Sequence, residues 1–159
     1  MKNKKFKFFS KSNKIETIFY DETSEYYSFL KNQFDQGYRQ VIISTSLIIS
    51  LLKELSTRYG MQVYKIEFNE DDEELAEEMS QFIQSIQKNP AYICLLCERL
   101  EFLSDDSSID ISRISFKGKI ETIHVDIKIQ SNGIVIVNEE AHNIVDSIIK
   151  PMVERGVFG

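Results

Sequence analysis

Tryptophan is absent from this 159-residue sequence, and proline, cysteine and histidine each occur only twice. Two cysteines cannot form the disulfide framework of a small secreted domain, so we expect a cytoplasmic protein. No apolar run approaches the roughly 20 residues that span a bilayer, so we expect no membrane segment. Residues 1–9 are basic but lack the apolar core and cleavage site of a signal peptide.

What is present is typical of a globular protein, with 42% hydrophobic and 28% charged residues. We find no repeat and no flexible linker, which predicts a single α/β domain over residues 1–159. Isoleucine occurs 22 times, and 14 lysines outnumber five arginines. Such usage is typical of AT-rich coding DNA and indicates a low-GC bacterium or one of its mobile elements.

The charge is unevenly distributed, although the net charge is only −6. Residues 1–14 hold six lysines and no acid, whereas residues 67–78 hold eight acids and no base. We interpret the Lys-rich start as an edge strand whose outward positions are charged.

The first two thirds of the chain predict alternating strands and helices. Apolar runs indicate buried strands at 41–44, 61–68 and 91–97, and helical periodicity indicates helices at about 46–58 and 71–88. Short connections between such elements favour right-handed crossovers and a small parallel βαβαβ sheet. The segment 91–103 has an alternative interpretation as a helix, because its apolar residues also form a helical stripe.

The last third predicts an antiparallel meander and a terminal helix. Strands are indicated at 109–116, 120–130 and 134–137, with turns at 117–119 and 131–133. In the middle strand His124, Asp126 and Lys128 alternate with apolar residues, which predicts one buried and one solvated face.

Two groups of polar residues would lie at the carboxyl edge of the predicted parallel sheet, where such folds bind ligands. Ser44, Thr45 and Ser46 follow a predicted strand and open a helix, which makes them an anion-binding candidate or an ordinary helix cap. A second, acidic group follows the predicted strand at 91–97. It is a candidate for holding Mg²⁺ or activating water, or else it is a solvated loop. Its members are Glu98, Glu101, Asp105 and Asp106.

A catalytic or metal-binding constellation is not apparent, and we expect no cofactor. Cys94 and Cys97 form a C-x-x-C pair inside an apolar stretch, without a second pair, which favours buried thiols that pack as small hydrophobic groups. His124 and Asp126 share a strand face, but two ligands do not make a metal site.

The acidic run is a candidate partner surface, although a charged first helical turn also explains most of it. The candidate residues are Glu70, Asp71, Glu74 and Glu78. We therefore expect a binding or accessory protein without catalytic activity whose partner is another protein. The alternatives are a nucleotide- or phosphate-binding domain or hydrolase that uses the sheet edge, and a nucleic-acid accessory factor that uses the Lys-rich start. The acidic isoelectric point near 5.0 disfavours the last of these.

Overall fold

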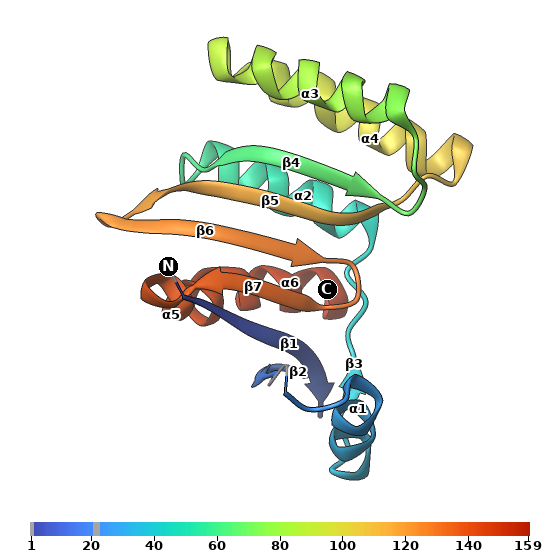
Figure 1. Ribbon diagram of the computed structural model, residues 1–159, viewed down its shortest axis with the longest axis vertical. Coiled ribbons are helices and arrows are strands. Elements are labelled where there is room, and N and C mark those ends of the chain that lie inside the picture. Colours follow the sequence, from blue (N-terminus) through green and yellow to red (C-terminus); the bar gives the residue numbers. More distant parts are fainter. Residues whose placement is uncertain (1, 21–22) are drawn as a thin grey trace.

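The computed structural model describes residues 2–20 and 23–159, which form one seven-stranded sheet and its covering helices (Figure 1). The strand order is β2-β1-β7-β6-β5-β4, and neighbours in this order are antiparallel. The short strand β3 pairs with β1. The strands are β1 (Asn3–Lys11), β2 (Lys14–Phe19), β3 (Arg39–Gln40), β4 (Gln62–Phe68), β5 (Ile111–Ile120), β6 (Ile123–Gln130) and β7 (Ile134–Asn138).

Most of the helices lie against one face of the sheet or beyond its edges, and the first helix packs on the other face near β1 and β2 (Figure 1). They are α1 (Tyr26–Asp35), α2 (Thr45–Thr57), α3 (Glu73–Lys88), α4 (Tyr92–Ser107), α5 (His142–Ile144) and α6 (Lys150–Phe158), with a 3₁₀ turn η1 at Glu139–Ala141 and a π-helical turn η2 at Val145–Ile149. The α3–α4 hairpin lies beside the edge strand β4, and α1 lies at the opposite end of the sheet.

The main core lies between the sheet and the helices α2 and α6. Alternate residues of β6, namely Val125, Ile127 and Ile129, are almost fully buried and belong to one cluster with Ile48 and Leu52 of α2. The period of two in β6 therefore separates a buried face from a polar one, as predicted. Burial of these side chains supplies most of the driving force for the fold.

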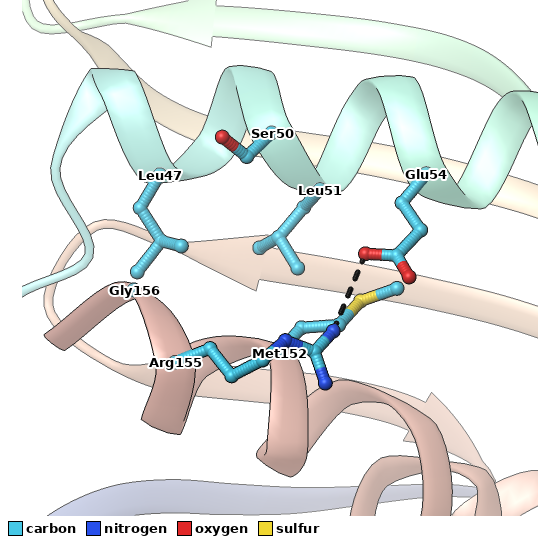
Figure 2. A pocket seen from close by; sticks show the side chains of 7 residues that line it. All are labelled: Leu47, Ser50, Leu51, Glu54, Met152, Arg155 and Gly156. Atoms are coloured by element: carbon cyan, nitrogen blue, oxygen red, sulfur yellow. Dashed lines mark ion pairs between the residues drawn. The ribbon is translucent and has the colours of Figure 1, made fainter. Parts of the chain in front are cut away.

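The two covering helices touch each other directly (Figure 2). Gly156 allows this approach, because a Cβ atom there would lie 2.3 Å from Cδ1 of Leu47. Nη2 of Arg155 lies 3.5 Å from Oε2 of Glu54 and closes one side of a hollow of about 230 Å³. This hollow is a gap in a helix–helix contact rather than a site with converging polar groups.

The predicted parallel βαβαβ sheet is wrong, because β4 pairs antiparallel with β5 and the segment 91–97 is not a strand. That segment begins α4, and Pro90 precedes the helix, where its missing N–H does no harm. The buried residues of α4 recur at helical spacing: Ile93, Leu96, Cys97, Leu100 and Leu103. The alternative helical interpretation of 91–103 is therefore confirmed.

The segment 41–44 is not a strand of the sheet either. Only Arg39 and Gln40 pair with β1, and the chain then runs extended to α2. The amide of Ile43 donates to the carbonyl of Ser131, so this segment packs against the β6–β7 turn instead of forming a ladder. The segment belongs to the buried core, and this burial gives its sequence the apolar character of a strand.

The predicted C-terminal meander is confirmed as β5, β6 and β7, but its first turn was placed too early. Lys117, Gly118 and Lys119 lie inside β5, and the chain turns at Glu121 and Thr122, which adopt left-handed φ values of 51° and 73°. Gly118 allows Met61 to pack closely against β5, because a Cβ atom at this position would lie 3.0 Å from the sulfur of Met61.

The Lys-rich start was expected to be an edge strand, but β1 lies between β2 and β7. Its residues Lys5 and Lys7 are therefore placed inside the sheet, with strands on both sides. None of the helices in the described ranges combines the length and apolar character needed to cross a membrane.

Candidate functional site

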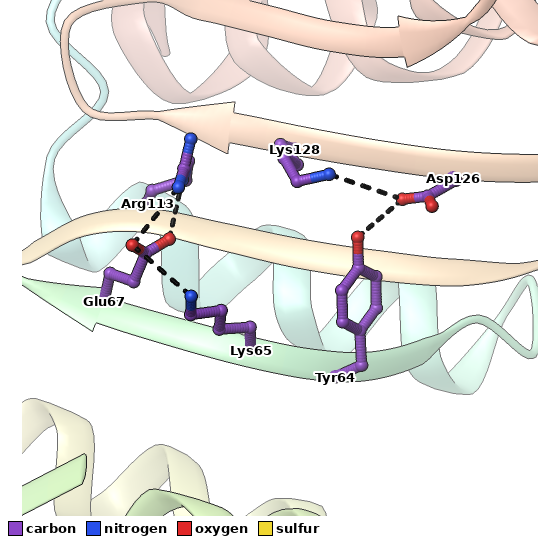
Figure 3. Close-up of polar contacts among 6 residues, drawn as sticks. All are labelled: Tyr64, Lys65, Glu67, Arg113, Asp126 and Lys128. Carbon is purple, nitrogen blue, oxygen red and sulfur yellow. Dashed lines mark hydrogen bonds and ion pairs between the residues drawn. The ribbon is translucent and has the colours of Figure 1, made fainter. Parts of the chain in front are cut away.

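The face of the sheet that points away from α2 and α6 is covered by helices only near α1, and its middle carries polar side chains (Figure 3). Strand pairing brings residues from five strands together on this face. We call it the open face and define it by thirteen residues: Lys5, Tyr64, Lys65, Glu67, Arg113, Ser115, Lys117, Lys119, His124, Asp126, Lys128, Gln130 and Ile136.

The open face is basic, although the protein as a whole is acidic. It carries six Lys or Arg residues and two acids, Glu67 and Asp126, whereas the whole chain has a net charge of −6. Both acids are engaged by basic or hydroxyl partners on the same face. The electrostatic potential of this face therefore favours an anion.

The first acid, Glu67, is held by Arg113 across the β4–β5 pair (Figure 3). The guanidinium donates through Nε to Oε2 at 2.6 Å and through Nη2 to Oε1 at 3.2 Å. Hydrogen bonding by Arg113 lowers the pKa of Glu67, and Nζ of Lys65 lies 3.9 Å from Oε1. The bidentate pair uses two of the five guanidinium N–H groups and leaves the others available.

The second acid, Asp126, accepts a hydrogen bond from the Tyr64 hydroxyl at 2.6 Å. A β-bulge between Val63 and Lys65 frees Tyr64 from the ladder, and its side chain crosses β5 to reach β6 (Figure 3). Burial, and then the hydrogen bond to Asp126, raise the pKa of Tyr64. The hydroxyl therefore keeps its proton at neutral pH and does not act as a base.

Ser115 lies at the centre of the open face, in register with Lys65 and Lys128. Its side chain is fully buried, and its hydroxyl has no hydrogen-bond partner among the described residues. A buried hydroxyl without a partner lowers the stability of a protein, and the full burial of Ser115 keeps its hydroxyl out of reach of a ligand on this face.

A hollow of about 530 Å³ lies at the end of the open face near the β1–β2 hairpin. Four basic residues line it, and no acid lies among its described lining residues. Phe19 also borders this hollow, but it is paired with Phe6, and its ring, which is 57% exposed, packs edge-on against the Phe6 ring on the other face of the sheet. The complete lining is Asn3, Lys4, Lys5, Phe19, Tyr20, Arg113, Lys128 and Ile136.

The predicted anion site at residues 44–46 takes part in local structure. The hydroxyl of Ser44 accepts from the amide of Leu47 at 3.2 Å and caps α2, while Ser46 is exposed on the first turn. Thr45 is buried, and its hydroxyl donates to Asp110 at 2.8 Å. The parallel sheet edge on which this candidate depended does not exist in the structure.

The acidic edge candidates Glu98, Glu101, Asp105 and Asp106 all lie on the exposed side of α4, and the parallel-sheet edge to which they were assigned does not exist. Oε1 of Glu101 lies 3.8 Å from Nζ of Lys53 in an exposed ion pair. Within residues 2–20 and 23–159 we find no group of three His, Cys, Asp or Glu side chains that could hold a metal ion.

The partner surface candidates Glu70, Asp71, Glu74 and Glu78 lie at the start of α3 and along it, beyond the β4 edge. Glu78 differs from the others, because Arg99 of α4 donates two hydrogen bonds to it, at 2.6 and 3.1 Å. It therefore joins the two helices of the hairpin. The acidic surface that remains is at the opposite end of the sheet from the basic hollow.

Sequence reasoning identified the polar side of β6 but missed the basic face to which it belongs. The only sequence signal for this face was the alternation of polar and apolar residues at 124–130. Nothing local to that segment indicates that Lys5 lies two strands away from Lys128, with only β7 between them.

Comparison of the chain with protein-family models, with curated proteins and with solved structures finds no significant match. Its function must therefore be inferred from the chemistry of the open face itself.

Proposed function

We propose that this chain is a cytoplasmic binding protein without catalytic activity, and that it holds an anionic partner on the open face. The observation that carries this proposal is the charge of that face: six basic residues stand against two acids that are already paired. Since the whole protein is acidic, such a concentration of positive charge is not a consequence of composition.

The internal contacts of the open face support binding rather than proton transfer. Glu67 is fixed by Arg113, and Asp126 is fixed by Tyr64 and lies 4.0 Å from Nζ of Lys128. These contacts hold the side chains in place before a partner arrives, which reduces the entropy lost on binding. Tyr64 has a raised pKa and donates its one O–H to Asp126, so it does not act as a base.

The partner expected from the sequence, another protein, fits this proposal when it presents an acidic segment. Charge complementarity of this kind mainly increases the association rate and selects among partners. The acids of α3 lie beyond the β4 edge and repel an anionic partner from that side. An incoming anion is therefore directed toward β6, β7 and β1.

The test is binding of fluorescein-labelled polyglutamate, measured by fluorescence anisotropy at 50 mM salt. The variant Lys117→Gln/Lys119→Gln/Lys128→Gln removes three charges from the open face. The matched control Lys31→Gln/Lys88→Gln/Lys150→Gln removes three charges from the helices. We expect the first variant to bind at least tenfold more weakly than wild type and the control to bind less than threefold more weakly.

Equal weakening in the two variants would contradict the proposal, because it would show that only the net charge matters. The absence of any binding by the wild type at 50 mM salt would also contradict it. Unfolding midpoints of both variants, measured by circular dichroism, establish that each is folded under the assay conditions.

A further inference from the structure

We propose that the α3–α4 hairpin binds a basic amphipathic helix of another protein, whose apolar side chains pack on Leu95 and Phe102 of α4. This inference is independent of the proposed function, because the hairpin lies beyond the β4 edge, at the opposite end of the sheet from the basic hollow. It depends on exposed apolar side chains and a groove between the two helices, and the charge of the hairpin identifies the partner.

Two large apolar side chains on the outer side of α4 remain half exposed in the part of the chain that the structure describes. Leu95 is 51% exposed and Phe102 is 52% exposed, whereas the residues that follow them, Leu96 and Leu103, are buried. Residues seven positions apart lie on one face of a helix, here about 10.5 Å apart along its axis. Leu95 and Phe102 therefore form one apolar stripe on the outside of the hairpin.

A hollow of about 280 Å³ between α3 and α4 continues this stripe. Phe102 lines the hollow together with Leu75 of α3 and Leu103 of α4, both of which belong to the core. A leucine, methionine or phenylalanine side chain of a partner can enter such a hollow and be desolvated there. Apolar side chains that fill pockets in this way contribute most of the affinity of many interfaces.

The groove is held in place before a partner arrives. Arg99 of α4 donates to Glu78 of α3 through Nε at 2.6 Å and through Nη2 at 3.1 Å, which joins the two helices beside the hollow. Leu96 and Leu100 anchor α4 in the core. A surface that is already ordered loses little conformational entropy on binding.

The same hairpin is strongly acidic. Residues 69–108 contain eleven acids and two bases, a net charge of −9, whereas the whole chain carries −6. One of the two bases, Arg99, is already paired with Glu78. Glu98 and Asp105, four residues before and three residues after Phe102, are exposed and make no ion pair within the described residues. Such positions are neighbours of Phe102 on the helix surface, so the apolar stripe is flanked by unpaired acids.

These features specify the chemistry of the partner. A helix that lies along α4 presents its own apolar side chains at the same spacing of about 10.5 Å, which matches Leu95 and Phe102. Lysine or arginine side chains beside that apolar face can pair with Glu98 and Asp105, and their aliphatic stems cover the rim of the stripe. A basic amphipathic helix therefore satisfies both the apolar and the acidic groups of the hairpin.

Other classes of partner satisfy only part of this surface. A nucleic acid or an anionic membrane is repelled by the net charge of the hairpin, and so is the hairpin of a second copy. The open face of a second copy is basic, but the thirteen residues that define it include one aliphatic side chain, Ile136. It would leave most of the exposed surface of Leu95 and Phe102 without an apolar partner.

The experiment measures the fluorescence anisotropy of a fluorescein-labelled 18-residue peptide of leucine, lysine and alanine whose leucines form one helical face. A second peptide of the same composition, with its leucines distributed over all faces, controls for charge. We expect the amphipathic peptide to bind the wild type at least tenfold more tightly than the second peptide at 150 mM salt. Equal binding of the two peptides would overturn the inference, because charge alone would then explain it.

The apolar stripe is tested by Leu95→Gln/Phe102→Gln, which is expected to bind the amphipathic peptide at least tenfold more weakly. The matched control Tyr27→Gln/Ile42→Gln removes two apolar side chains that are 75% and 64% exposed elsewhere, and less than a twofold change is expected. Circular dichroism establishes that both variants are folded. Equal weakening in the two variants, or no weakening in the first, would contradict the assignment.

The acids are tested by Glu98→Gln/Asp105→Asn, which is expected to weaken binding at least threefold at 50 mM salt and less at 300 mM salt. The control Glu121→Gln/Glu140→Gln changes the net charge by the same amount at exposed positions outside the hairpin. It is expected to weaken binding less than 1.5-fold. The same loss in both variants would show that net charge, and not the hairpin, attracts the peptide.

Phe102→Trp reports the place of binding, since the chain has no other tryptophan and neither peptide contains one. Bound peptide is expected to shift the indole emission to shorter wavelength, because the ring leaves water. This variant keeps a large aromatic side chain at the site, and binding without a shift would overturn the location.

The remaining outcomes separate this inference from the others. The open-face variant Lys117→Gln/Lys119→Gln/Lys128→Gln is expected to bind the peptide as tightly as the wild type, so the proposed function can fail while this inference holds, and the reverse. Sedimentation of the wild type alone shows whether it self-associates. Self-association that Leu95→Gln/Phe102→Gln abolishes would overturn the inference, because the occupant of the stripe would then be a second copy of this chain.

Discussion

The Tyr64 hydroxyl donates a 2.6 Å hydrogen bond to Oδ1 of Asp126 and thereby connects β4 to β6 across the intervening strand β5. The ring also has cations nearby, with Nζ of Lys117 at 5.4 Å and Nζ of Lys128 at 5.9 Å from its centroid. One bulged residue of the edge strand thus contacts charged groups of the next two strands, β5 and β6, on the open face.

Removing this hydroxyl is expected to lower stability modestly. Tyr64→Phe should reduce the free energy of unfolding by about 1 kcal/mol, because a partly exposed hydrogen bond to a carboxylate lies at the low end of the usual range. Urea unfolding of Tyr64→Phe, of Asp126→Asn and of the double variant measures this. The double variant should lose less than the sum of the two single losses, whereas full additivity would show that the two groups do not interact.

Lys7 is expected to make stability depend on pH in the alkaline range. Its side chain is fully buried in β1, its Nζ donates to the carbonyl of Asn132, and burial lowers its pKa from 10.5 to about 8. Between these values the unfolded chain keeps a proton that the folded chain has lost, so stability rises with pH. Unfolding experiments at pH 7.5 and 10.5 should show this gain, on the order of 3 kcal/mol, in the wild type relative to Lys7→Met.

The comparison with Lys7→Met is necessary because tyrosines titrate in the same range. Burial raises the pKa of Tyr26, whose ring lies 5.8 Å from Nζ of Lys7, and this makes the folded state less stable as pH rises above 10. Both proteins contain Tyr26, so the difference between them isolates Lys7. Identical pH profiles for the two proteins would contradict the prediction.

Asn138 is expected to be essential for the end of the β6–β7 pair. It is fully buried, its Oδ1 accepts from the amide of Asp126 at 2.9 Å and its Nδ2 donates to the carbonyl of His124 at 2.8 Å. Asn138→Ala leaves two backbone groups without partners and should lower the free energy of unfolding by about 2–4 kcal/mol. Asn143→Ala, in α5, serves as the control, and a loss below about 0.5 kcal/mol at Asn138 would contradict the structure.

The two cysteines are expected to react at very different rates. The prediction that both thiols are buried is wrong for Cys94, which is exposed on the outer side of α4, whereas Cys97 is buried and burial raises its pKa to about 11. Since the thiolate is the reactive form, iodoacetamide at pH 8.5 should add one group to the folded protein and two to the denatured protein. Intact-mass spectrometry and peptide mapping check the number and the site, and equal modification of both thiols in the folded state would refute the prediction.

Local periodicity was sufficient to predict most of the elements. The helices at 46–58 and 71–88 appear as α2 and α3, and the strand at 61–68 appears as β4, within a few residues. The two helices have an apolar pattern with a single period over their whole length, whereas β4 is rich in β-formers but contains a bulge between Val63 and Lys65. The strand predicted at 91–97 was wrong because six largely apolar residues in a row look like a buried strand. In the structure they form the first turns of α4, where Leu95 is 51% exposed on the outer side.

Strand pairing and the open face could not be predicted in the same way. A parallel sheet followed from the alternation of strands and helices, yet α3 and α4 form a hairpin beside β4 and the chain returns antiparallel as β5. The hollow depends on Lys5 and Lys128 lying on either side of β7. That proximity is set by contacts between residues more than 120 positions apart, and no local pattern encodes them.

The pairing of β1 with β7 also determines when the protein can finish folding during its synthesis. Lys7 meets Ile134 in that pair, so the β1–β2 hairpin leaves the ribosome long before its neighbour exists. At about 5–20 residues per second, roughly 6–25 s separate the synthesis of the two strands. Throughout this interval β1 presents an unpaired edge, and its lysines then oppose aggregation of the nascent chain, a role distinct from any that they have in the finished sheet.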